Sequence, residues 1–213
     1  HEDGPMVSNK DALTRKTLNA YLSADVNRWF TQEASVFYTA QNRSSIMSVF
    51  RDVYSIRLPS WYPEGYMPAE VVGSTEDLLI DSPRNACLYQ PADNKQTSTP
   101  RISLRSIIKP LKGWTITGEY TYQQEDMDYR SYTGRYIVAD AQLAIRTLPA
   151  EGQDVYKKNS STTKYNALNL FTNYDVKWKG HSFSLVAGFN QEYNFNTYLN
   201  TQVLGQTVSS VPS

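Results

Sequence analysis

The stretch that decides the fold runs from Leu168 to Glu192 and reads LNLFTNYDVKWKGHSFSLVAGFNQE. Mostly apolar and mostly polar side chains alternate up to Trp178, and they alternate again from Phe183 onward. Successive side chains of a β-strand point to opposite faces, so this pattern predicts two strands with one apolar and one polar face. The tight turn around Gly180 joins them as an antiparallel hairpin.

Similar alternation on both sides of a short turn occurs three times in the chain. The predicted hairpins cover residues 14–40, 101–122 and 165–195. The connections between hairpins are much longer, at 41–100 and 123–164. In an up-and-down sheet all short turns lie at one edge and all long loops at the other, which is the asymmetry of outer-membrane barrels. We therefore predict an all-β fold of antiparallel up-and-down strands that forms a partial segment of a large transmembrane β-barrel.

The long loops also contain stretches with helical spacing. Apolar residues of segment 44–57 recur at intervals of three and four, and Ser44 or Ser45 could cap a helix there. Segment 139–148 has room for one or two helical turns. We expect short helices at these two places and irregular structure in the rest of the loops.

Three of the four tryptophans stand beside the three short turns. They are Trp29, Trp114 and Trp178. Tryptophan is enriched at membrane–water interfaces, because its ring is apolar while its N–H group can remain hydrated. We interpret these three residues as membrane-interface aromatics, which would place the apolar face of the sheet against lipid. The alternative is a soluble sandwich whose end is closed by these rings.

Composition restricts the chemistry of the chain. Among its 213 residues, 21 Lys and Arg balance 21 Asp and Glu, so no charge excess favours nucleic acid. The only histidines are His1 and His181, no catalytic motif is found, and we do not expect an enzyme. The single cysteine, Cys87, has no disulfide partner. No cofactor or metal site is predicted, although the acidic residues between 64 and 81 leave a calcium site open.

Two of the predicted hairpins resemble a known family. RISLRSIIKPLKGWTITGEYTY, from Arg101 to Tyr122, resembles the mid-barrel hairpin of TonB-dependent outer-membrane receptors, above all the SusC/RagA-like group of Bacteroidetes. KGHSFSLVAGFNQE, from Lys179 to Glu192, resembles the hairpin that follows in that family. The hairpin at 15–40 and the run Trp61-Tyr62-Pro63-x-Gly65 are consistent with it, so the resemblance spans nearly the whole chain.

The resemblance implies a role in nutrient uptake. Members of this family import glycans or peptides across the bacterial outer membrane, with a TonB complex as energy source and a SusD-like surface lipoprotein as lid. Their barrels have about 22 strands and enclose an N-terminal plug domain. This chain has about six predicted strands and no plug domain. We therefore interpret residues 1–213 as a single segment of a receptor barrel, contributing wall and outside loops.

Aromatic residues of the predicted loops are the candidate ligand-binding residues. They are Trp61, Tyr62, Tyr66 and Tyr132. Aromatic rings with polar edges suit an oligosaccharide or peptide ligand, although these rings could instead pack the loops together. The alternative function is a soluble β-sandwich carbohydrate-binding module, in which the rows of Leu168 and Phe183 would face each other across a core.

Overall fold

The structure is a computed structural model of the chain. It describes residues 2–3, 10–46, 65–82, 85–86, 89, 91–140, 142–148 and 154–205. Strands make up 79% of these residues, and the main sheet is antiparallel and up-and-down. The prediction of an all-β fold with this topology is confirmed.

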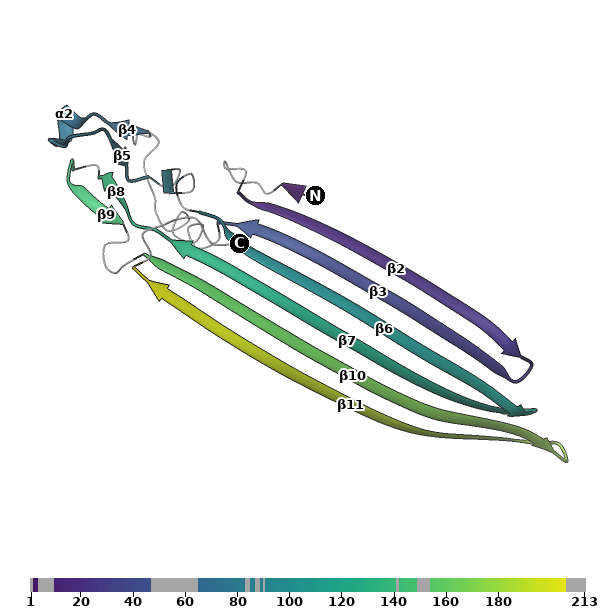
Figure 1. Cartoon of the computed structure of the whole chain (residues 1–213). Coiled ribbons are helices and arrows are strands. Elements are labelled where there is room, and N and C mark those ends of the chain that lie inside the picture. Colours follow the sequence, from purple (N-terminus) through teal and green to yellow (C-terminus); the bar gives the residue numbers. More distant parts are fainter. Residues whose placement is uncertain are drawn as a thin grey trace.

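Six long strands lie side by side in sequence order (Figure 1). They are β2 (Ala12–Asn27), β3 (Phe30–Ser45), β6 (Asp93–Leu111), β7 (Trp114–Thr133), β10 (Val155–Trp178) and β11 (His181–Leu204). Each neighbouring pair is antiparallel along most of its length. A two-residue strand, β1 (Glu2–Asp3), pairs with the start of β2.

The three short turns lie together at one end of the sheet, and the long connections lie at the other (Figure 1). Two of the turns are joined to the next hairpin by backbone hydrogen bonds. Lys109 N donates to Trp29 O, and Asp175 N donates to Gly113 O, both at 2.7 Å. Lys179 and Gly180 have φ of +49° and +85°. Positive φ at both central residues matches the twist of the adjoining strands.

The strands extend well beyond the predicted hairpins. The connection predicted at 41–100 shortens to 46–92, and the one predicted at 123–164 shortens to 134–154. The strand expected to end near 195 continues to Leu204. The extensions at 94–99 and 157–164 are polar on both faces, so the alternation stops there while the ladder of backbone hydrogen bonds continues. The extension of β11 still contains the apolar residues Leu199, Val203 and Leu204.

A small second sheet lies at the long-loop end (Figure 1). Its strands, in spatial order, are β4 (Tyr66–Met67), β5 (Leu78–Ile80), β8 (Tyr136–Ala139) and β9 (Ile145–Leu148). β4 and β5 belong to the first long connection, and β8 and β9 belong to the second. β5 and β8 pair in parallel, whereas the other two pairs are antiparallel. The four-residue helix α2 (Ala69–Val72) precedes β5.

The helical turns predicted in segment 139–148 are not found. Segment 139–148 contains the end of β8, a turn and β9. Asp140 Oδ1 stabilises that turn by accepting hydrogen bonds from the backbone N–H groups of Gln142 and Ala144, both at 2.9 Å. Ser44 and Ser45 are the last two residues of β3. The helix predicted at 44–57 falls mainly on residues 47–57, which lie outside the described part of the chain.

Most buried apolar side chains belong to the loop end. In the described residues they are Ile46, Leu79, Ile80, Val138, Ala139 and Ala167, and only Ala167 lies in the large sheet. Within these residues no second layer covers either face of that sheet. A sandwich would place the row of Leu168 and the row of Phe183 on two facing sheets. In the structure Val176, from the row of Leu168, pairs with Phe183, so the two rows are neighbours on one face of one sheet. No helix in the described ranges has the length and hydropathy to cross a membrane.

Candidate functional site

One face of the large sheet is apolar over about nine residues of each of its first four strands. Cross-strand pairing builds rows across it: Leu22 pairs with Ala34, Ala34 with Leu104, Leu104 with Tyr120, and Tyr120 with Leu168. We call this surface the apolar band. It comprises alternate side chains, starting with the first residue of each range, of 18–26, 30–38, 100–108, 114–122, 166–178 and 183–195.

Large side chains of the apolar band are open to the surroundings. Leu22 is 67% exposed, Leu185 is 64% exposed and Phe189 is 54% exposed. Isolated apolar residues on a protein surface are ordinary, but a contiguous face of this extent marks a contact with lipid or with another protein.

Tryptophan side chains gather at the short-turn end of the sheet. Trp29 lies in the β2–β3 turn, Trp114 begins β7, and Trp178 ends β10. Trp29 and Trp178 are 53% and 62% exposed, while Trp114 is half-buried. Trp114 Nε1 donates to Thr172 Oγ1 at 2.7 Å, so its polar edge is satisfied on the sheet. One edge of the apolar band therefore carries the three rings that the sequence singled out.

The opposite face of the sheet is polar. Glu33 forms an ion pair with Arg105 at 3.6 Å, and a hydrogen bond of 3.0 Å joins the hydroxyls of Ser103 and Thr121. One row across this face is polar at every position: Ser23, Glu33, Arg105, Glu119, Asn169 and Asn190. Cross-strand pairs of this kind stabilise a solvated sheet surface.

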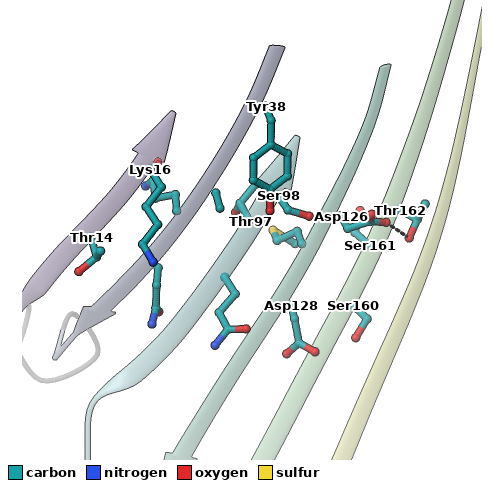
Figure 2. Close-up of a pocket in the computed structure, with 15 residues that line it drawn as sticks. Thr14, Lys16, Tyr38, Thr97, Ser98, Asp126, Asp128, Ser160, Ser161 and Thr162 are labelled. Atoms are coloured by element: carbon teal, nitrogen blue, oxygen red, sulfur yellow. Dashed lines mark hydrogen bonds between the residues drawn. The ribbon is translucent and has the colours of Figure 1, made fainter. Parts of the chain in front are cut away.

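A hollow of about 640 Å³ adjoins the apolar band on the side of the long loops, and its lining residues are shown in Figure 2. We call it the polar hollow. Its lining includes Lys16, Tyr38, Ser98, Asp126, Asp128 and Ser160, from five adjacent strands. The prediction did not include it, because hydroxyl and amide side chains on a strand extension resemble ordinary loop residues in a sequence.

Hydrogen bonds and ion pairs fix one side of the polar hollow. Asp126 accepts hydrogen bonds from Thr162 Oγ1 at 2.8 Å (Figure 2) and from Gln124 Nε2 at 2.7 Å. Asp128 lies 3.0 Å from Arg130 Nε and 3.5 Å from Lys158 Nζ. The charge of Asp128 is therefore balanced by two cations, whereas Asp126 is held by two neutral donors.

The predicted ligand-binding residues do not form one group. Tyr66 lies on β4 in the small sheet, where its hydroxyl is hydrogen-bonded to that of Tyr89. Tyr132 lies on β7 and not in a loop, so that part of the prediction is wrong. Burial, together with the neighbouring Asp154 carboxylate, raises the pKa of Tyr132. Trp61 and Tyr62 lie outside the described residues.

Two carboxyl groups at the loop end have raised pKa values. Burial raises the pKa of Asp93, and the hydrogen bond that it accepts from Tyr129 Oη at 2.9 Å opposes this only in part. Burial also raises the pKa of Asp81, with Arg146 opposing and Asp140 reinforcing the effect. Among the described residues, no group of three or more His, Cys, Asp or Glu side chains is placed to hold a metal ion.

The chain matches no protein-family model, and a search of curated proteins finds no significant match. The features of the sheet that bear on function are the exposed apolar band, the polar opposite face, and the contrast between short turns at one end and long connections at the other.

Proposed function

We propose that this chain forms part of the wall of a transmembrane β-barrel in the bacterial outer membrane. The observation that carries the proposal is a single-layer sheet whose apolar face is exposed. A tilted strand needs about 9–11 residues to cross the hydrocarbon core, and the apolar band takes about nine from each of its first four strands. Barrel strands alternate between a lipid-facing apolar side and a polar lumen, as these strands do.

The two ends of the sheet support an orientation. Outer-membrane barrels have short periplasmic turns and longer extracellular loops. On this basis the turns at Trp29, Gly113 and Gly180 would face the periplasm, and the small sheet would face outward. Trp29, Trp114 and Trp178 would then lie at the periplasmic membrane–water interface of the outer membrane, where amphipathic rings are favoured.

The free edge of β11 supports a larger barrel. This strand has 24 residues, and β10 is its only partner in the described part of the chain. A long unpaired strand in lipid would leave backbone N–H and C=O groups without hydrogen bonds, so a wall of this kind requires neighbouring strands. A transporter barrel of about 22 strands would supply them.

We further propose that the barrel belongs to a TonB-dependent transporter of the SusC/RagA-like group, which imports glycans or peptides. The hairpin resemblance supports this class. The polar face would line the lumen, and the loop end would help to shape the ligand cavity. A TonB complex and a SusD-like surface lipoprotein would be partners of the whole transporter, and the work would be binding and passage without covalent chemistry.

Uptake in the native host tests this function. We expect that deleting the gene abolishes uptake of one class of fluorescently labelled oligosaccharide or peptide, and that dissipating the proton gradient has the same effect in the wild type. We also expect the protein to remain in the outer-membrane fraction after a carbonate wash. Recovery of the protein in the soluble fraction would overturn the proposal.

A further inference from the structure

We propose that the polar hollow binds the phosphorylated saccharide head group of an outer-leaflet glycolipid whose acyl chains lie on the apolar band. This inference rests on the proposed membrane location. The glycolipid would have the chemistry of lipid A, an acylated and phosphorylated disaccharide. The hollow would thus be a lipid site on the outside of the barrel, separate from the lumen through which a nutrient passes.

The position of the hollow fits an amphiphile. The last apolar row contains Leu18 and Tyr38, which pair with each other. The next row on the same face is polar except at Ala40, which lies between Lys16 and Ser98, and it continues through Asp126 to Thr162. Adjacent rows on one face are about 7 Å apart along a strand. A ligand that touches both rows must therefore change from apolar to polar within the length of a single sugar ring.

The groups in the hollow fit a sugar phosphate. Hydroxyl groups of Ser98, Ser160 and Thr162 come from β6 and β10, and Figure 2 shows these side chains on the same side of the sheet as Lys16. Within the described residues Lys16 Nζ forms no ion pair, whereas Arg130 and Lys158 are both paired with Asp128. Lys16 is the one cation among the residues that line the hollow, and its charge-assisted contact with an incoming phosphate would be among the stronger hydrogen bonds.

The size and place of the hollow agree with this occupant. About 640 Å³ lies within the range of pockets that hold small ligands. The hollow lies at the long-loop end of the band, which the proposed orientation assigns to the outer leaflet. A free soluble sugar would gain nothing from the adjoining apolar rows, whereas an acylated sugar would contact both surfaces.

Native mass spectrometry of the full-length protein in detergent tests the site. The probes are diphosphoryl lipid A, phosphatidylglycerol, and the phosphorylated disaccharide without acyl chains. We expect lipid A to bind about tenfold more tightly than phosphatidylglycerol, because the latter has the charge but no saccharide. We expect the deacylated disaccharide to bind more weakly than lipid A.

Matched variants locate the binding. Ser98→Trp fills the hollow, while Thr99→Trp places the same ring on the opposite face of the same strand, and both positions are half-buried. We expect Ser98→Trp to remove the preference for lipid A and Thr99→Trp to keep it. Lys16→Ala should weaken lipid A binding about fivefold, and Arg15→Ala on the other face should not.

Three outcomes would overturn the head-group site alone: equal affinity for the two lipids, an unchanged preference in Ser98→Trp, or equally tight binding of the deacylated disaccharide. A protein that retains no lipid of either kind would overturn the membrane proposal as well. The two failures are therefore distinguishable.

Discussion

At the scale of single residues, Gly113 fixes how the second hairpin meets the third. Its φ is +84°, and a Cβ atom built on it would lie 2.2 Å from the backbone oxygen of Asp175. Next to this contact, Asp175 N donates a backbone hydrogen bond of 2.7 Å to Gly113 O. No side chain fits at Gly113 without moving one of the two strands.

Gly113→Ala should therefore be costly. Gly180 is the matched control, because its φ is +85° and nothing lies within 4 Å of a Cβ added there. We expect Gly180→Ala to cost about 1 kcal/mol from left-handed backbone strain alone, and Gly113→Ala to cost at least about 3 kcal/mol because the Asp175 hydrogen bond is also strained. Urea unfolding of the full-length protein in detergent measures both, and equal costs would contradict the packing described here.

Asp93 gives stability a dependence on pH. Its folded-state pKa lies above the ordinary value of 3.8, so the folded protein holds the proton more tightly than the unfolded chain. The stability that the protonated Asp93 carboxyl contributes is complete below pH 3.8 and is lost as the pH rises through the folded-state pKa. In Asp93→Asn, the amide oxygen can still accept the hydrogen bond from Tyr129.

We expect the wild type to lose thermal stability relative to Asp93→Asn as the pH rises above 3.8. Thermal unfolding midpoints of the two proteins, measured at a series of rising pH values, check this. A wild type that gains stability relative to the variant as pH rises would show that the sign is wrong.

At the scale of elements, the two faces of one strand should respond oppositely to charge. Val36 lies on the apolar band, and the adjacent Ser35 lies on the polar face. If the band faces lipid, Val36→Arg should cost about 2–4 kcal/mol and reduce assembly into the outer membrane. Ser35→Arg should have little effect.

The measurement is the amount of heat-resistant folded barrel in purified outer membranes, compared between the two variants. Equal yields would mean that Val36 faces water, since it is already exposed in the sheet.

The elements also show how much of the fold is readable from the sequence. The hairpins were predictable wherever apolar and polar side chains alternate, as between Leu168 and Phe189, and the turns were marked by Gly113 and Gly180. The loop-side ends of β6 and β10 were not predictable, because residues 94–99 and 157–164 are polar on both faces. In these extensions the backbone hydrogen bonds and polar cross-strand contacts hold the strands, and neither requires alternating apolar and polar residues.

At the scale of the whole molecule, the sheet has two long edges. The outer edge of β11 is open along its length in the described structure. We expect these 213 residues, expressed alone without detergent, to aggregate through their edges and the apolar band. Size-exclusion chromatography checks this, and a monodisperse soluble monomer would contradict the barrel proposal.

The candidate sites were less predictable than the fold. The tryptophans could be located because each adjoins a turn that the sequence marks, as Trp178 adjoins Lys179 and Gly180. The polar hollow could not, because Lys16 and Ser160 are far apart in sequence and meet only through the order of the strands. Tyr132 was placed in a loop because the strand around it has no alternation to identify it.

The central claim is that the apolar band touches acyl chains, and nitroxide accessibility in a lipid bilayer tests it most directly. Leu104→Cys and Ser103→Cys, each in a Cys87→Ser background of the full-length protein, place a spin label on opposite faces of β6. We predict that the label at 104 collides with oxygen dissolved in the hydrocarbon and is shielded from a water-soluble nickel chelate, while the label at 103 shows the reverse. Equal access of the nickel chelate to both labels would contradict the claim.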